Sequence, residues 1–294
     1  MNESPLMEIS GLFHYRQGYG GLMVHSDVKT RYPLMLVHGA GFRDLHFPVY
    51  WGRIASRLAD AGAELFFGGQ DGWGTVESNA RMLARQITEV LHTGGYDRIN
   101  LICHSKGGLE ACAAAHLPEM AGKIASITTI ATPHHGSKTV DRLLCLPRWI
   151  FAVAGYAVDH WIRLFGDHTP DFARVCREFS STHMLQFNAC TPDIAGIFYQ
   201  SYACSMHHAS SDWRLWISYL VVRHIEGEND GLVSVRSALW GEHAYCLHSP
   251  GKRGLSHFDA IDLSRAPLSD GSGGKFDIVD FYFSLVSGLR ERGC

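Results

Sequence analysis

One stretch of the chain places a serine in a setting that favours nucleophilic chemistry. The apolar run Ile99–Cys103 leads into Ser105, and a helical pattern opens at Gly107. A strand, a tight turn and a helix would hold the Ser105 hydroxyl at the apex of the turn, close to a helix N-terminus. The usual pattern is Gly-x-Ser-x-Gly, and Cys103, another small residue, stands at the first glycine. The stretch predicts a nucleophile elbow.

A serine needs a base to take its proton, and the base needs a carboxylate to orient it. Histidine suits the base role because its ordinary pKa is about 6.5. Asp230 and His257 each lie in a glycine-flanked loop that follows strand-like sequence, which selects them as acid and base. The chain order Ser105, Asp230, His257 is the order expected of α/β-hydrolases. His104 is the rival base and Asp259 the rival acid.

A second glycine-containing loop follows an earlier strand pattern. The apolar segment Tyr32–Val37 runs directly into His38–Phe42, which contains two glycines. One interpretation is a simple turn from strand to loop. The other is an oxyanion loop, in which the N–H groups of Ala40 and Lys106 stabilise a developing negative oxygen.

The elements that must position these residues alternate between strand and helix. Buried-strand patterns occur at residues 32–37, 62–67, 99–103, 124–130 and 196–202. Helical patterns occur at residues 49–58, 78–92 and 274–286. This alternation predicts a mainly parallel sheet with helices on both faces, and the chemistry of such sheets lies at the carboxyl ends of the strands. Both glycine-containing loops follow such ends.

The segment at residues 140–193 breaks the alternation. It is rich in large apolar residues, among them Trp149, Phe151 and Trp161. One interpretation is a buried helical insertion. The other is a cap or lid over the serine that offers apolar surface to an acyl chain or a lipid interface. Both can hold at once.

The composition describes an ordinary globular protein. A net charge of −3 gives no electrostatic case for nucleic-acid binding, and the chain lacks an apolar stretch of the length that spans a membrane. The N-terminal residues lack the pattern of a secretory signal, so the cytoplasm is the expected location unless a leader has been removed. In a reducing compartment, the eight cysteines are expected as free thiols.

Six segments together resemble the bacterial true-lipase family I, the secreted triacylglycerol lipases of Pseudomonas, Burkholderia, Staphylococcus and Geobacillus. The segments are Leu36–Gly39, Tyr50–Gly52, Ile102–Gly108, Thr128–Ser137, Asn229–Val233 and His257–Asp259. The resemblance runs from residue 32 to residue 289 and is weakest between residues 140 and 225. It implies a single α/β-hydrolase domain over residues 1–294, with a mostly parallel central sheet flanked by helices and a helical lid near residues 140–193.

Carried over position by position, the resemblance makes Ser105 the nucleophile, Asp230 the triad acid and His257 the base. The amides of Ala40 and Lys106 form the oxyanion hole. The implied activity is hydrolysis of acylglycerols or other apolar acyl esters through an acyl-enzyme, at a lipid–water interface and without a cofactor for the chemistry. A short-chain esterase, a phospholipase or a thioesterase of the same fold would use the same chemistry. A non-catalytic binding protein is the rival from another class.

The resemblance also implies a structural Ca²⁺ near the catalytic histidine. Asp259, two residues after His257, matches one ligand position, and Asp212 lies only roughly at another. Without the ion, Asp259 would cap the next helix. One branch of the family has a disulfide that ends between the acid and the histidine. Cys246 lies there, with Cys190 or Cys204 as its candidate partner.

Overall fold

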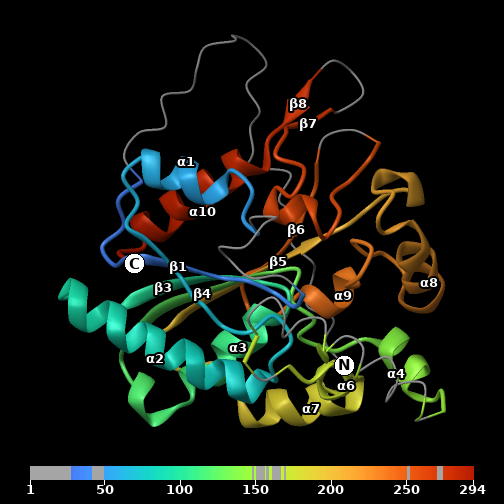
Figure 1. The fold of residues 1–294 in the computed structure, drawn as a ribbon. Helices are drawn as coiled ribbons and strands as arrows, with labels where there is room; N and C mark the ends of the chain where they lie inside the picture. The colour runs from blue at the N-terminus through green and yellow to red at the C-terminus, as the bar shows by residue number, and fades with distance from the viewer. Residues whose placement is uncertain are drawn as a thin grey trace.

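A six-stranded sheet forms the centre of the molecule in this computed structural model (Figure 1). The structure describes residues 28–41, 50–147, 149, 156, 159–160, 167–168, 170–249, 252–269 and 274–294. The strands are β1 (Leu34–Val37), β2 (Leu65–Phe67), β3 (Ile99–His104), β4 (Ile124–Ile130), β5 (Phe198–Cys204) and β6 (Ala244–Leu247). They lie in the order β2-β1-β3-β4-β5-β6, and every pair is parallel. The predicted parallel sheet is confirmed.

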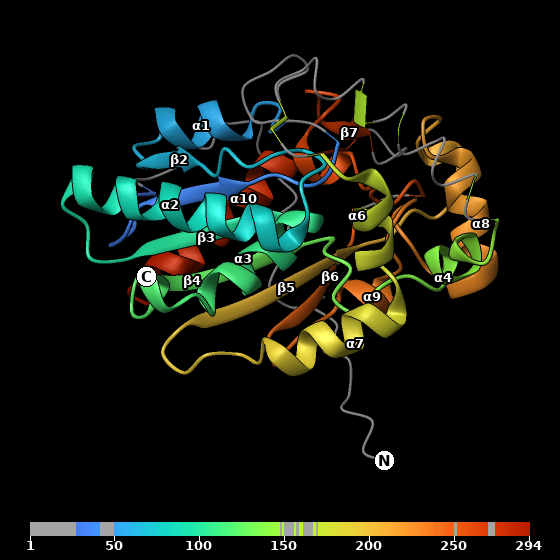
Figure 2. The same cartoon turned by 60° about the horizontal axis from the view of Figure 1, so that its bottom comes forward.

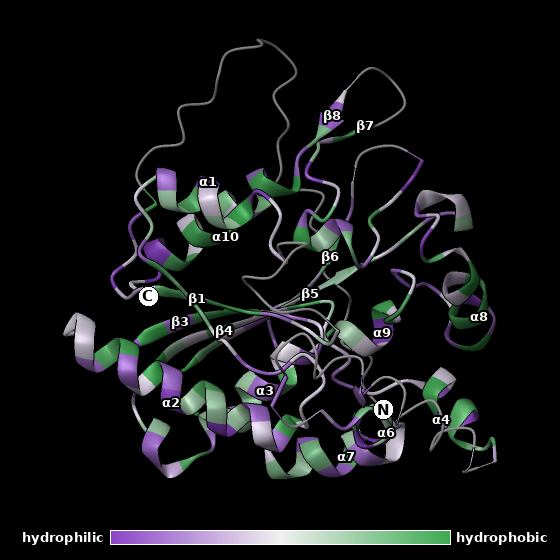
Figure 3. Cartoon of the chain, viewed as in Figure 1, coloured by the Kyte–Doolittle hydropathy of each residue, from purple (hydrophilic) through white to green (hydrophobic). Residues whose placement is uncertain are grey.

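Side chains of successive strand residues point to opposite faces, and helices cover both faces. Leu34 and Leu36 of β1 pack in the cluster that holds residues of α1 (Ile54–Asp60) and α10 (Ile278–Glu291). Met35 and Val37 pack in the other cluster, with α2 (Val76–Gly94) and α3 (Lys106–Ala115). Figure 1 shows the two pairs of helices on opposite sides of the sheet, and Figure 3 shows that much of β1, β3 and β4 is hydrophobic. The sheet is therefore buried on both sides.

Helix α2 shows how local sequence sets the ends of an element. Thr75 is its N-cap, and the Thr75 side chain accepts a hydrogen bond from Ser78 N. Gly95 ends it in the left-handed conformation, with φ of 68°. The predicted helix at residues 78–92 is confirmed and extends by two residues at each end.

The C-terminal region differs from the prediction. Lys275–Phe276 form β8, which pairs with β7 (Leu268–Ser269) in a separate antiparallel ladder. The final helix starts at Ile278, because the Asp277 side chain caps it by accepting from Val279 N. The expected start at residue 274 was therefore wrong. Strand β6 and helix α8 (Trp216–Glu226) were not predicted.

The described part of the insertion at residues 140–193 consists of helices joined by short irregular segments. Its helices are α4 (Lys138–Leu144), α6 (Phe172–Glu178) and α7 (Ser181–Cys190). Helix α4 packs against α8 and α6, and α6 packs against α7. Figure 2 shows α4 beside α8 and α6 beside α7. Residues 148, 150–155, 157–158, 161–166 and 169 lie outside the described residues. The lid role and the single-domain organisation stay predictions.

The remaining elements of the described residues are short: η1 (Pro118–Met120), η2 (Ala209–Ser211), η3 (Asp259–Ile261) and α9 (Val235–Ala238). Within the described part of the chain, no helix is long and apolar enough to cross a bilayer. All eight cysteines are free thiols, so the disulfide from Cys246 to Cys190 or Cys204 is not formed. Cys204 is buried in β5, whereas Cys190 is exposed at the end of α7.

Candidate active site

Ser105 sits in the sharp turn between β3 and α3. Its φ of 53° and ψ of −128° are unusual for a residue with a side chain, and such strain is typical of functional turns. The turn is held by β4 and the segment after it. Ser105 N donates to Ile130 O at 2.9 Å, and Thr132 Oγ1 donates to Ser105 O at 2.7 Å. The predicted elbow is present, with Cys103 fully buried in the strand before it.

The loop after β1 approaches the serine closely because glycine stands at position 39. A Cβ atom built on Gly39 would lie 2.7 Å from Ser105 Cβ. Gly107 has a similar role, since its Cβ would lie 2.4 Å from the backbone oxygen of His38. Among the described residues, no hydrogen-bond acceptor is found for the N–H of Ala40 or of Lys106. The loop that holds Ala40 thus lies next to the turn that holds Ser105 and Lys106, and the oxyanion role of the two amides stays a prediction.

Asp230 and His257 are hydrogen-bonded, with 2.7 Å between His257 Nδ1 and Asp230 Oδ2. The other carboxylate oxygen accepts from Leu232 N at 2.9 Å and from Val233 N at 2.7 Å. His257 N also donates to the backbone oxygen of Asp230 at 2.8 Å. Both side chains are almost fully buried, so the carboxylate orients the imidazole in a site of low polarity.

His104, the rival base, is bound differently. Its Nδ1 lies 2.7 Å from Tyr50 Oη, and burial followed by the nearby His257 holds its pKa well below the ordinary value. It is therefore neutral at pH 7. The ring centroids of His104 and His257 are 4.5 Å apart, which places His257 at the sheet edge where Ser105 turns. Asp259, the rival acid, pairs with Arg253 instead of a histidine.

The two candidate calcium ligands lie close together. Ser256 Oγ donates to Asp212 Oδ2, and Ser256 N donates to Asp259 Oδ2, both at 2.9 Å. Arginines already bind both carboxylates: Arg214 Nη2 lies 2.7 Å from Asp212 Oδ2, and Arg253 Nη1 lies 2.5 Å from Asp259 Oδ2. Calcium needs six to eight oxygen ligands. Among the described residues, no group of three or more His, Cys, Asp and Glu side chains could hold a metal. This arrangement suits guanidinium groups better than calcium.

Sequence reasoning missed several residues that support the site. Tyr50 and Thr132 lie inside the segments that carry the family resemblance, so a signal was available for both. The i,i+4 spacing of Lys106 and Glu110 signals a pair on one helix face. Arg214 and Arg253 each bind a carboxylate of their own loop, two and six residues away, and neither spacing belongs to a regular element that would predict the pair.

Several proteins of similar sequence are named triacylglycerol lipases. No protein-family model matches the chain. The chain is 28% identical to triacylglycerol lipase 2 of Saccharomyces cerevisiae over 265 residues, which covers 83% of the chain and 74% of the yeast protein. It is 39% identical to the triacylglycerol lipase of Pseudomonas fragi over 119 residues, which covers 40% of each protein. The similarity to the bacterial lipase therefore spans well under half of either chain.

Similar solved structures show the fold class of the chain. A mature lipase from Bacillus licheniformis superposes with a TM-score of 0.62 at 21% identity, covering 83% of this chain and 92% of the lipase. A metagenomic carboxyl esterase superposes with a TM-score of 0.64 at 15% identity, covering 90% of this chain and 76% of the esterase. The chain has the α/β-hydrolase fold. The two proteins of similar sequence, from yeast and Pseudomonas fragi, are named triacylglycerol lipases.

Proposed function

We propose that the chain is a serine ester hydrolase that acts on lipids or other apolar acyl esters. One observation carries the proposal: the hydrogen-bonded Asp230–His257 pair lies at the sheet edge where Ser105 occupies a strained elbow. The names of the sequence relatives, triacylglycerol lipases from yeast and bacteria, support the same chemistry. The segment that holds the acid, Asn229–Val233, also supports kinship with the bacterial true-lipase family I.

The first half of the reaction forms an acyl-enzyme. His257 takes the proton of Ser105 Oγ as this oxygen attacks the ester carbonyl, and Asp230 stabilises the imidazolium that results. The N–H groups of Ala40 and Lys106 donate to the oxyanion of the tetrahedral intermediate. When the intermediate collapses, the C–O bond of the ester breaks and His257 gives its proton to the departing alcohol.

The second half releases the acid. His257 takes a proton from a water molecule, and the resulting hydroxide adds to the acyl carbon. Collapse of this second intermediate breaks the bond to Ser105, whose oxygen recovers the proton from His257. No step needs a metal or an organic cofactor.

An apolar surface on α8 supports a lipid substrate. Tyr219 and Val222 are buried, but α8 also carries apolar residues that are exposed to solvent. Figure 3 shows that part of α8 is hydrophobic. We call these exposed residues, with the tryptophan before the helix, the α8 apolar surface: Trp213, Trp216, Ile217, Leu220 and Val221. Leu232, two residues after Asp230, is also exposed. Exposed apolar residues gathered in this way are typical of surfaces that contact lipid or protein.

The test compares wild type with Ser105→Ala on p-nitrophenyl esters from acetate to palmitate. We expect kcat to fall by on the order of 10⁴- to 10⁶-fold in the variant. Ser56→Ala, on the exposed side of α1, is the matched control and should leave the rate unchanged. A preference of the wild type for long chains favours a lipase over a short-chain esterase. Hydrolysis of phospholipids would indicate a phospholipase, and hydrolysis of acyl thioesters a thioesterase.

Equal rates for wild type and Ser105→Ala would rule out Ser105 as the nucleophile. A fluorophosphonate probe separates enzyme from binding protein, because only an activated serine is labelled. Wild type that neither turns over esters nor takes the label would favour the non-catalytic binding protein.

A further inference from the structure

A fully buried lysine follows the proposed nucleophile. Lys106 is 0% exposed and forms an ion pair with Glu110, one turn further along α3, which is 1% exposed. Lysine and glutamate are rarely buried to this extent, and a buried ion pair is often no more stabilising than apolar residues of the same volume. Stability alone therefore does not explain this pair beside the serine.

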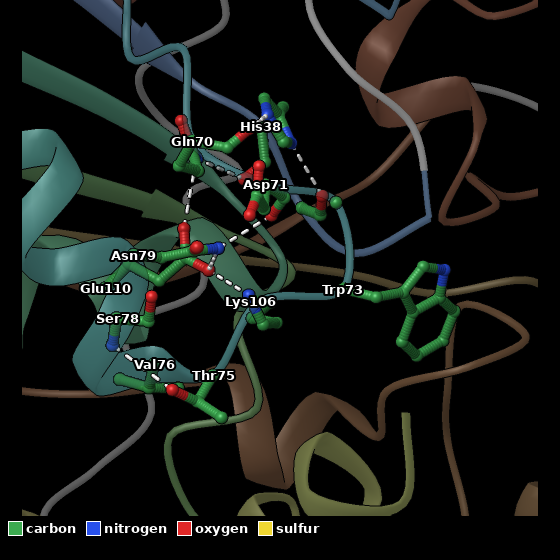
Figure 4. Close-up of polar contacts among 12 residues, drawn as sticks. His38, Gln70, Asp71, Trp73, Thr75, Val76, Ser78, Asn79, Lys106 and Glu110 are labelled. Carbon is green, nitrogen blue, oxygen red and sulfur yellow. Dashed lines mark hydrogen bonds and ion pairs between the residues drawn. The ribbon is translucent and has the colours of Figure 1, made fainter. Parts of the chain in front are cut away.

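Two buried amide side chains extend the pair beyond α3. Asn79 Nδ2, from the first turns of α2, donates to Glu110 Oε1 at 2.7 Å. Gln70 Nε2, from the loop that precedes α2, donates to Glu110 Oε2 at 3.0 Å. Figure 4 shows Lys106 and both amides converging on this one carboxylate. The Glu110 carboxylate thus accepts from three donors, which come from three parts of the chain.

The same loop before α2 holds the oxyanion loop on both sides of Ala40. On one side, Gln70 Nε2 donates to His38 O at 3.0 Å, and His38 Nε2 lies 3.0 Å from the backbone oxygen of Gln70. On the other side, Gly41 N donates to Gly72 O at 3.1 Å. The position of the Ala40 N–H therefore depends on the position of residues 70–72.

We propose that the Lys106–Glu110 pair positions the oxyanion hole. Glu110 fixes Gln70, Gln70 fixes His38, and the Ala40 N–H is thereby held at the distance from α3 that an oxyanion requires. Lys106 supplies one donor through its backbone and locates the other through its side chain. Its side chain is a positioning residue that does not touch the substrate. The inference rests on the proposed function, since an oxyanion hole matters only in an enzyme that forms an oxyanion.

The experiment replaces Lys106 with methionine, which keeps most of the side-chain volume and removes the charge. We expect kcat for p-nitrophenyl butyrate to fall by about 10- to 100-fold, below the loss for a deleted oxyanion donor, while KM stays within a few-fold of wild type. The inhibition constant of butaneboronic acid, whose tetrahedral adduct with Ser105 places an oxygen in the hole, should rise by a similar factor. Thermal unfolding is measured for every variant.

A double variant keeps the test valid if the unpaired Glu110 prevents folding. Lys106→Met with Glu110→Gln removes both charges and leaves an amide oxygen that can accept from Asn79. It should show the same loss of kcat and of boronate affinity. Glu77→Gln is the matched control, because it breaks an exposed ion pair with Arg81 that has the same i,i+4 spacing. The side chains of Glu77 and Arg81 are both 60% exposed. This control should leave both readouts unchanged.

Folded Lys106 variants with wild-type kcat and wild-type boronate inhibition would overturn the inference, even if their unfolding midpoint falls, because a purely structural pair predicts that combination. If the wild type is active and the variants keep its kcat and boronate inhibition, the positioning role is overturned while the proposed function stands. A wild type that hydrolyses no ester and takes no fluorophosphonate label would overturn the proposed function, and this inference with it.

Discussion

Tyr50 joins the two turns of the proposed active site through one hydroxyl group. Gly39 N donates to Tyr50 Oη at 2.7 Å, and the same oxygen lies 2.7 Å from His104 Nδ1. The ring is buried, and its edge-on contact with Trp51, at 5.3 Å between centroids, fixes its direction. The hydroxyl therefore connects Gly39, at the start of the proposed oxyanion loop, to His104, the residue before the proposed nucleophile.

Replacing Tyr50 with phenylalanine leaves the Gly39 N–H without this acceptor. A buried group that loses its partner costs about 1–3 kcal/mol, so the free energy of unfolding should fall by that amount. We also expect kcat to fall by about 10- to 100-fold, because small displacements of catalytic groups are costly. Urea unfolding and p-nitrophenyl butyrate kinetics measure the two effects. Tyr32→Phe, just before β1 and away from its carboxyl end, is the control. Unchanged kinetics in Tyr50→Phe would contradict the prediction.

Gly39→Ala tests the close approach of the oxyanion loop. The added methyl group would lie 2.7 Å from both Ser105 Cβ and Tyr50 Oη, so the loop must move away from the serine. We expect kcat/KM to fall by at least about 100-fold with the fold retained, as circular dichroism would show. Gly288→Ala, in α10, is the control because its added methyl meets nothing within 4 Å. A fully active Gly39→Ala enzyme would show that the loop is not part of the site.

At the scale of elements, the two loops beside His257, the proposed base, each contain an arginine that binds a carboxylate of the same loop. Arg214 binds Asp212 in one loop, and its guanidinium also lies 5.1 Å from the centroid of the Phe258 ring. Arg253 binds Asp259 in the other loop. The loops meet at Ser256, directly before His257 in the sequence. The arginines thus stabilise the backbone that presents the imidazole.

Because guanidinium groups bind both carboxylates, we expect EDTA to change neither the activity nor the unfolding midpoint of the wild type. Arg253→Gln should lower the free energy of unfolding by about 1–3 kcal/mol, less than for a fully buried pair because Arg253 is partly exposed. Arg81→Gln breaks an exposed pair and should cost less than about 1 kcal/mol. Activity that is lost in EDTA and restored by Ca²⁺ would instead support the calcium site at Asp259 and Asp212.

The Asp212 loop also predicts a pH dependence. Burial opposes ionisation of Asp212, but hydrogen bonds from Arg214 and Ser256 outweigh it and lower the pKa of the carboxyl. A carboxyl whose pKa is lower in the folded state stabilises the fold above its unfolded pKa of about 3.9, and this stability is lost as the pH falls through the folded pKa. Asp212→Asn should therefore be less stable than wild type at pH 7, with a difference that shrinks below about pH 4. Urea unfolding from pH 7 to pH 3 measures it, and a constant difference would contradict the linkage.

For the whole molecule, the α8 apolar surface is an exposed apolar region of the described chain that the proposed lipid substrate could contact. Trp213 is 80% exposed, Ile217 is 59% exposed and Trp216 is 52% exposed. Leu215 and Tyr219 pack beneath it with Met206, so the helix is anchored from below while its outer face stays open. The loop of Asp230 also contacts this region, since a Cβ on Gly231 would lie 2.8 Å from Leu215.

Trp213→Asp should separate hydrolysis at an interface from hydrolysis in solution. A charge on this surface is costly to bring against lipid, so we expect at least about a tenfold lower rate on emulsified triacylglycerol. The rate on soluble p-nitrophenyl acetate should stay at the wild-type value. Glu89→Gln, a surface change on α2 on the far side of the molecule from α8 in Figure 1, is the control. Equal losses on both substrates would show that Trp213 acts on the site itself.

Much of the scaffold was predictable from short windows of sequence. Apolar runs and helical periodicity located five of the six strands of the central sheet, and helix α2, because burial on a sheet face leaves a pattern within a few residues. The elbow at Ser105 was also predictable from a short window, because small residues must flank a strained turn. Strand β6 was missed because only one of its four residues, Leu247, is buried, and α8 because it is apolar on two faces.

The sequence by itself determined the candidate nucleophile, the parallel arrangement of strands and the chain order of acid and histidine. Only the tertiary structure decided that Asp230, and not Asp259, meets His257, since these groups lie 27 residues apart. It also decided that Arg253 holds Asp259 and that Gln70 reaches Glu110 across 40 residues. Local patterns record which residues must be buried or must turn. The choice of partner among buried charges depends on distances of a few ångströms, which only the packed chain fixes.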